Sequence, residues 1–156
     1  MEILFLADMP NESLKIAQWY FDEWAYTVPG VTVDMVHQKV LDKSKNRMEI
    51  PLILLVHEDK ELAGVAELKL RENLNHPEYE HWIGGVYVSP GLRGKGYASA
   101  LISKAKSHAI ELGIKSLYLQ CEDHNIDLYL RHDFKILHNS EHNSVKTTIM
   151  VHDTSA

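Results

Sequence analysis

Apolar residues recur at two different spacings along this chain, and each spacing predicts a different kind of element. The short apolar stretch between Met1 and Asp8 predicts a first strand. After Asp8, apolar residues recur every three to four positions, which predicts a helix that Val28-Pro29-Gly30 ends. Thr32 can cap a second helix, and the polar residues 42–49 connect it to the next apolar segment. The apolar positions are Leu14, Ala17, Tyr20, Phe21, Trp24 and Ala25 in the first helix, and Val33, Val36 and Val40 in the second.

The next part of the chain has the pattern of strands. Residues 51–57 contain a compact apolar run, and residues 61–70 alternate after a polar turn, so the two segments predict a hairpin. A loop over 71–80 and a strand over 82–88 come next. The alternation places Leu62, Gly64, Ala66, Leu68 and Leu70 on one face, and Ala63, Val65, Glu67 and Lys69 on the other.

A glycine-rich loop over residues 89–96 introduces the second half of the chain. The segments expected after it are a helix over 97–112 ended by Gly113, a strand over 116–121, a short helix over 125–131, and a last hairpin of 134–137 and 145–151. The predicted order is β-α-α-β-β-β-α-β-α-β-β. It predicts an α/β fold with a mixed sheet, antiparallel in its first half and with a β-α-β unit in the middle.

Composition narrows the class of protein. The length of 156 residues predicts one domain over 1–156, and 45% apolar residues suffice for a core. The 16 basic and 22 acidic residues leave a net charge of −6, which argues against a nucleic-acid partner. Cys121 is the single cysteine, which fits a reducing compartment. No apolar run reaches the ~20 residues that span a bilayer and the N-terminus lacks signal-peptide features, so we expect a cytoplasmic protein without membrane contact.

The glycine-rich loop predicts an anion-binding site. It comes after a strand and opens a helix, where free N–H groups and the helix dipole favour negative charge. A phosphate-binding P-loop does not fit, because Ser89 stands where that motif needs glycine and Gly96 stands where it needs serine or threonine. A dinucleotide-binding motif fits better, but Ser99 replaces its third glycine and too little chain remains after it for a doubly wound sheet.

A third interpretation accounts for more residues. Arg93-Gly94-Lys95-Gly96-Tyr97-Ala98 resembles the Arg/Gln-x-x-Gly-x-Gly/Ala loop of the GNAT superfamily of acyl-CoA-dependent N-acyltransferases. Residues 82–90 resemble the fourth strand of that family, and Leu128 to Phe134 resembles its Leu-Tyr-x-x-x-Gly-Phe segment. The order of elements from residue 1 agrees as well, so the resemblance covers nearly the whole chain. Asp133 stands where the family usually has glycine, and aspartate is among the residues that tolerate positive φ.

The resemblance implies that the protein uses acetyl-CoA as cosubstrate. In that family the loop wraps the pyrophosphate with backbone N–H groups, and the pantetheine arm pairs with the free edge of the fourth strand, which splays from the fifth. The residues that the resemblance assigns to the edge are Val86, Tyr87 and Val88, and those that it assigns to the loop are Arg93, Gly94, Lys95, Gly96, Tyr97, Ala98 and Ser99.

The resemblance also suggests catalytic groups. Tyr129 matches the tyrosine that protonates the departing thiolate, although it could instead only pack beneath Phe134. The amine acceptor must lose a proton, which Glu67, Glu80 or a water chain could take. For both carboxylates, a solvated position on the surface is the competing interpretation.

Other signals are discounted. His138 and His142 are four residues apart, but Asn and Ser around them favour a loop and surface histidines, so no metal is expected. Cys121 lacks a recognisable histidine and acid, which favours a small buried residue. Tyr26 and residues 28–30 are candidates for contact with the acceptor, because the first two helices and their connection line the acceptor cleft in the GNAT fold.

The sequence therefore predicts an acetyl-CoA-dependent N-acetyltransferase. We expect direct attack in a ternary complex, without a metal or a covalent enzyme intermediate. The acceptor is expected to be an amine-bearing small molecule or peptide, which the negative net charge suits, and a homodimer is possible. A catalytically silent acyl-CoA-binding module is the main alternative, and a dinucleotide-binding oxidoreductase is the more distant one.

Overall fold

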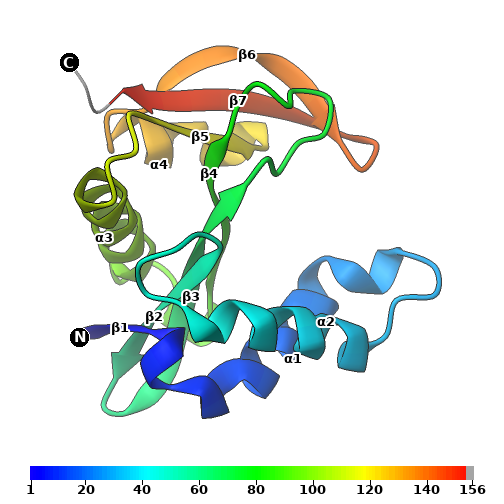
Figure 1. Ribbon diagram of the computed structural model, residues 1–156, viewed down its shortest axis with the longest axis vertical. Coiled ribbons are helices and arrows are strands. Elements are labelled where there is room, and N and C mark those ends of the chain that lie inside the picture. Colours follow the sequence, from blue (N-terminus) through cyan, green and yellow to red (C-terminus); the bar gives the residue numbers. More distant parts are fainter. Residues whose placement is uncertain (154–156) are drawn as a thin grey trace.

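The structure is a computed structural model that describes residues 1–153 (Figure 1). It has the mixed α/β architecture that the sequence predicts, with the predicted order of elements. The strands are β1 (Glu2–Phe5), β2 (Leu52–Glu58), β3 (Glu61–Leu70), β4 (His81–Val88), β5 (Ser116–Cys121), β6 (Lys135–His142) and β7 (Val145–Asp153). The helices are α1 (Ser13–Glu23), α2 (Val33–Asp42), α3 (Tyr97–Glu111) and α4 (Ile126–Leu130).

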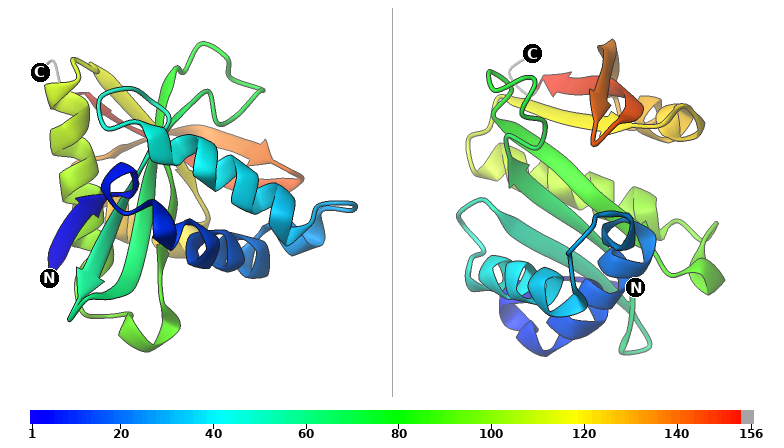
Figure 2. Two further views of the ribbon diagram at one scale, coloured as in Figure 1. Left: turned by 60° about the horizontal axis from the view of Figure 1, so that its bottom comes forward. Right: turned by 90° about the vertical axis from the view of Figure 1, so that its right-hand side faces the viewer.

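The strands form one mixed sheet of order β1-β2-β3-β4-β5-β7-β6. Neighbouring strands are antiparallel except β4 and β5, which are parallel and joined through α3. Figure 2 shows α1 and α2 together on one face of the first four strands, with α3 on the opposite face. The crossover that α3 makes places its N-terminus at the end of β4, where the glycine-rich loop lies.

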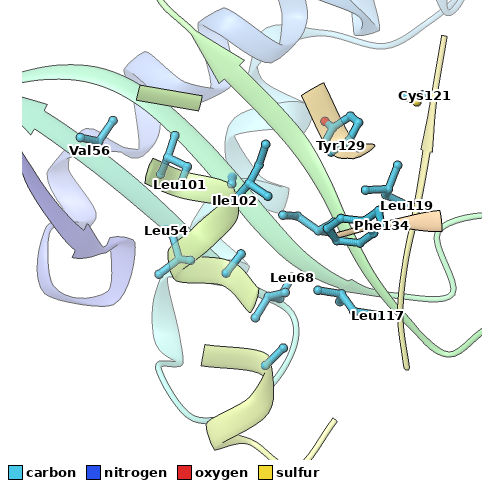
Figure 3. Packing of buried hydrophobic residues seen from close by; sticks show 14 of the residues in the cluster. Leu54, Val56, Leu68, Leu101, Ile102, Leu117, Leu119, Cys121, Tyr129 and Phe134 are labelled. Atoms are coloured by element: carbon cyan, nitrogen blue, oxygen red, sulfur yellow. The ribbon is translucent and has the colours of Figure 1, made fainter. Parts of the chain in front are cut away.

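Strand β2 explains why both faces need a helical cover. It is buried from Leu52 to His57, with successive side chains pointing to opposite faces. Leu54 and Val56 pack with Leu101 and Ile102 of α3 (Figure 3), whereas Ile53 and Leu55 pack with residues of α1 and α2. A strand buried on both sides has the continuous apolar run that the sequence shows.

The first two helices have the buried positions and the N-terminal cap that their sequences predict. Ile16, Ala17 and Tyr20 form the buried side of α1, at helical spacing. The Thr32 side chain accepts a hydrogen bond of 3.2 Å from the backbone N–H of Met35, so the predicted cap of α2 is confirmed. A short 3₁₀ turn, Lys43–Lys45, extends α2 and brings Lys43 over the sheet.

Two predictions about the strands are wrong in detail. In β3 the alternation changes phase, because Ala63 is an extra residue between Leu62, which pairs with His57, and Gly64, which pairs with Val56. Leu62 therefore packs on the α1 and α2 side. Strand β6 also extends through His142, so the polar segment expected to be a loop is mostly paired with β7.

Candidate active site

Strands β4 and β5 separate after one backbone pair. In the part of the chain that the structure describes, Trp82 and Tyr118 are the only Cα partners of the two strands. Figure 1 shows β4 running steeply away from β5 and β7 beyond this point. The C-terminal half of β4 consequently keeps β3 as its neighbour on one side and has an open edge on the other.

A β-bulge lies in this open half of β4. Glu67 pairs with Gly84 and Val65 pairs with Tyr87, so Gly85 and Val86 together oppose a single residue of β3. Gly85 has a positive φ of 58°. Val86 of the bulge is half-buried and packs on the α3 side. Beyond the bulge, the half-buried Tyr87 packs on the α1 side and Val88 is buried.

The glycine-rich loop between β4 and α3 leaves room for a ligand. Gly94 and Gly96 have φ of 78° and 89°, and a Cβ on either would meet no atom within 4 Å. Gly96 is the residue that caps α3, whose first turn then exposes N–H groups without a side-chain cap. Backbone donors and open space at a helix start suit the pyrophosphate of a coenzyme A thioester.

The other loop residues have distinct positions. Arg93 uses its side chain locally, because its Nε donates to the carbonyl of Val88 at 2.9 Å and its guanidinium lies 5.4 Å from the Tyr87 ring centre. Lys95 is exposed. Tyr97 is buried and packs in the core, whereas Ala98 and Ser99 are half-buried in the first turn of α3.

Tyr129 lies on the α4 side of the opening. It is buried in the same cluster as Cys121, and its ring meets Phe134 edge-on at 6.1 Å (Figure 3). Burial, and after it the charges at Cys121 and Glu72, raise the pKa of Tyr129 well above its ordinary value. The hydroxyl therefore stays protonated as a donor. Asp133 has a φ of 66°, so the aspartate occupies the left-handed conformation expected at this position.

Glu67 is buried, so the competing interpretation of Glu67 as a solvated surface carboxylate is wrong. It is 1% exposed, on the face of β3 that α1 and α2 cover. Its Oε1 accepts a 2.7 Å hydrogen bond from Lys43 Nζ. Burial works against its ionisation, but the ammonium groups of Lys69 and Lys43 outweigh burial and hold the pKa of the Glu67 carboxyl below its usual value.

The Tyr20 hydroxyl lies beside this carboxylate. A Cβ on Gly85 would lie 2.9 Å from Glu67 Oε2 and 3.0 Å from the Tyr20 oxygen, so both oxygens converge above the bulge. Burial and the charge of Glu67 raise the pKa of Tyr20 well above its ordinary value. The hydroxyl is buried and makes no hydrogen bond of ordinary geometry among residues 1–153.

A second ion pair lies along the same face. Lys69 Nζ donates to Glu72 Oε1 at 3.1 Å, and Gln120 Nε2 of β5 donates to Glu72 Oε2 at 3.3 Å. Glu72 and Lys69 border Gly84. Glu80, in contrast, is exposed and pairs with Arg71, so its position on the surface is confirmed.

Aromatic residues of α1, together with Trp24 directly after it, pack against Tyr87 beside the bulge. Trp19 and Trp24 lie 5.0 and 6.1 Å from Tyr87, measured between ring centres, and Tyr20 lies 5.6 Å from Trp24. Tyr26, in the turn after this helix, is 60% exposed, so it is free to meet a ligand.

Cys121 and the histidines were the remaining sequence signals. Cys121 is buried with its Sγ 4.0 Å from Met150 Sδ, and burial, with Asp123 and Glu122 after it, raises the pKa of this thiol to about 11. Within residues 1–153 no three His, Cys, Asp or Glu side chains are grouped as metal ligands would be. No helix of that part of the chain is long and apolar enough to cross a membrane.

The comparisons with known proteins agree with this geometry. The model of the acetyltransferase (GNAT) family matches residues 13–134. The chain belongs to the GNAT acetyltransferase family. Among curated proteins no sequence matches it significantly.

Solved structures share the fold at low identity. An aminoglycoside 6'-N-acetyltransferase complexed with coenzyme A superposes with a TM-score of 0.76 at 11% identity, over 98% of this chain and 97% of that one. A ribosomal-protein-alanine N-acetyltransferase from Brucella melitensis gives 0.74 at 17%, over 98% and 99%. A putative acetyltransferase from Salmonella typhimurium with its cofactor acetyl-CoA gives 0.72 at 17%, over 97% and 92%.

The structure adds site residues that sequence reasoning missed. Tyr20 has the spacing of a core residue of α1, and nothing in the sequence links Lys43 to Glu67, which lies 24 positions away. Lys69 carries a weak signal, because it shares a strand face with Glu67. Glu72 and Gln120 come from a loop and another strand, so only the sheet order brings them together.

Proposed function

We propose that the protein transfers the acetyl group of acetyl-CoA to the primary amine of a small molecule or peptide within a ternary complex. The observation that carries the proposal is the open edge of β4 leading into a glycine loop with free space at the start of α3. This arrangement seats a long thioester, with the pyrophosphate at the loop and the acetyl group near the bulge. Membership of the GNAT family and the neighbours with acetyl-CoA or coenzyme A support it.

The cosubstrate is held by the backbone in this proposal. The N–H groups of residues 93–99 donate to the pyrophosphate, and residues 86–88 of β4 pair with the pantetheine arm. A phosphate at a helix N-terminus gains from both the free donors and the helix dipole. Gly94 and Gly96 permit close approach because neither has a Cβ between the backbone and the ligand.

The acceptor attacks beside the bulge. Its nitrogen forms the bond to the acetyl carbonyl carbon, and the carbon–sulfur bond breaks. Glu67 takes the proton that the attacking nitrogen releases, and Tyr129 donates its hydroxyl proton to the departing thiolate. Both residues then regain their starting states through solvent, so the net proton movement is from amine to thiol. Because nearby lysines keep Glu67 ionised, it is ready to receive a proton at neutral pH.

Binding and turnover measurements together test the proposal. Acetyl-CoA is titrated calorimetrically, and thiol release is then measured with a panel of amines. Saturable, amine-dependent thiol release with a stoichiometric N-acetyl product supports the proposal. Tight acetyl-CoA binding without release on any amine would instead identify a silent acyl-CoA-binding module.

A further inference from the structure

We propose that Glu72 limits the transferred acyl group to the size of acetyl, because its carboxylate closes the narrow end of the opening between β4 and β5. This inference rests on the proposed function, since it concerns which acyl-CoA thioester the same site accepts. It is carried by the position of that carboxylate, which lies against β4 and is bonded to β5 where the two strands separate.

The register of the strands identifies the narrow end of the opening. Trp82 and Tyr118 are the Cα partners at which β4 and β5 pair. Gly84 and Gln120 each come two residues later, so they would be the next neighbours on the same face if the pairing continued. Gly84 also pairs with Glu67 of β3, so this face is the one that α1 and α2 cover.

Glu72 bridges these two positions. Gly84 has no side chain, and a Cβ there would collide with Glu72 Oε1. Glu72 Oε2 accepts a hydrogen bond of 3.3 Å from Gln120 Nε2, and Oε1 accepts one of 3.1 Å from Lys69 Nζ. The Glu72 side chain is 13% exposed. A carboxylate held from both sides therefore lies over Gly84 and reaches across to β5.

Both faces of the sheet are packed behind this bridge. Trp82 is fully buried, its ring centre lies 5.8 Å from that of Tyr118, and Tyr79 stacks on Tyr118 at 4.3 Å. On the opposite face, Ile83 and Leu119 are buried in the core that includes α3 (Leu119 is labelled in Figure 3). A ligand in the opening consequently ends at Glu72.

The proposed path of the cosubstrate leads to this bridge. The pantetheine arm runs along β4 from the glycine loop toward the bulge, and the thioester lies beside Gly85. Gly84 is the next residue of the strand, so atoms beyond the acetyl methyl group approach Glu72 Oε1. The charge of Glu72 also contributes to the raised pKa of Tyr129, the proposed donor to the thiolate, which agrees with a position near the thioester.

A carboxylate in this position disfavours longer acyl chains. Each methylene buried among apolar atoms strengthens binding about fourfold. Beside Glu72 that gain is lost, because a longer chain would displace the carboxylate from Lys69 and Gln120 or remove its remaining water. An acetyl group has no atom beyond its methyl carbon, so it fits without this cost.

A series of thioesters tests the inference on the unchanged protein. Thiol release is measured with acetyl-, propionyl-, butyryl- and hexanoyl-CoA and the amine that accepts acetyl best. We expect kcat/KM for butyryl-CoA to be about 10-fold or more below that for acetyl-CoA. Equal or higher values for the longer thioesters would overturn the inference and leave acyl transfer intact.

A variant locates the preference at Glu72. Glu72→Ala should raise the ratio of kcat/KM for butyryl-CoA to that for acetyl-CoA about 10-fold, the effect of two buried methylenes. A general loss of stability does not move this ratio, because both thioesters are measured on the same variant. The control is Glu78→Ala, which removes a carboxylate of the same loop that is 60% exposed and should keep the wild-type ratio. A wild-type ratio in Glu72→Ala, or an equal change in Glu78→Ala, would overturn the assignment.

Calorimetry separates this inference from the proposed function. Acetyl-CoA and butyryl-CoA are titrated without an acceptor, so no transfer occurs. The wild-type protein should bind butyryl-CoA no more tightly than acetyl-CoA, whereas Glu72→Ala should bind it about 10-fold more tightly. This result supports the inference even if no thiol is released. Absence of release with every thioester and amine would contradict the proposed function, and tighter binding of butyryl-CoA by the wild-type protein would contradict the inference.

Discussion

Gly85→Ala perturbs the place where the bulge, Glu67 and Tyr20 meet. An alanine here would have to keep the positive φ of Gly85, which costs about 1–2 kcal/mol in the left-handed region. It would also lie 2.9 Å from Glu67 Oε2 and 3.0 Å from the Tyr20 oxygen, closer than real Cβ atoms tolerate without displacement. Overpacking of this kind costs about 1–3 kcal/mol, so we expect a total destabilisation of about 2–5 kcal/mol.

Gly113→Ala is the matched control. Gly113 has a φ of 81° and an added Cβ would meet nothing within 4 Å, so the variant carries the backbone cost without the crowding. The two variants should therefore differ by about 1–3 kcal/mol in the free energy of unfolding, which corresponds to roughly 3–10 °C in Tm. Urea and thermal unfolding measure this difference.

Activity provides the second readout of Gly85→Ala. Displacing Glu67 from the bulge should lower kcat by about 10²-fold, the effect of a misplacement of about 1 Å at a reacting centre. Acetyl-CoA affinity should change little, because the glycine loop is untouched. If Gly85→Ala is as stable as Gly113→Ala and turns over as wild type does, the convergence of Glu67 and Tyr20 above the bulge has no role.

Three further variants probe the loop and the two proposed catalytic groups. Gly96→Ala should weaken acetyl-CoA binding in calorimetry more than Gly113→Ala does, although both glycines have a positive φ. Equal affinities of the two variants would show that the loop does not contribute to binding. Tyr129→Phe should keep acetyl-CoA binding but lower single-turnover rates by ~10²–10⁴, and unchanged rates would make the residue structural. Lys43→Met removes one of the charges that lower the pKa of Glu67, so that pKa should rise. The acid limb of the kcat/KM profile should then move to higher pH. The loss of stability that accompanies protonation of Glu67 as pH falls should move to higher pH as well. A pH profile that coincides with wild type would exclude Glu67 as the proton acceptor.

Most of the fold could be predicted because local patterns determine it. The helical spacing of α1, the Thr32 cap and the apolar run of β2 each depend on neighbours within a few residues. The phase change in β3 could not be predicted, because the extra residue Ala63 is visible only in the register with β2. The length of β6 was missed for a similar reason, since pairing with β7 overrides the loop preference of its Asn and Ser residues.

The site was predicted less completely than the fold. The glycine loop is contiguous in sequence and carries a recognisable spacing, so its residues could be named. Glu67 could be named as a candidate, but its burial and its partner Lys43 depend on how α2 ends over the sheet. Glu72 of the loop after β3 contacts Lys69 of β3 and Gln120 of β5, and no local pattern connects segments so far apart.

The single backbone pair between β4 and β5 has a consequence for the lifetime of the protein. The sheet behaves there as two blocks held by α3 and side-chain packing, with main-chain groups of β4 left facing the gap. If the cosubstrate lies in that gap, as proposed, it would supply contacts to both blocks and bind the folded chain alone. Occupancy at a hundred times Kd would add about 2.7 kcal/mol to the free energy of unfolding. The supply of acyl-CoA would thereby govern how fast the chain is lost to proteolysis as well as how fast it works.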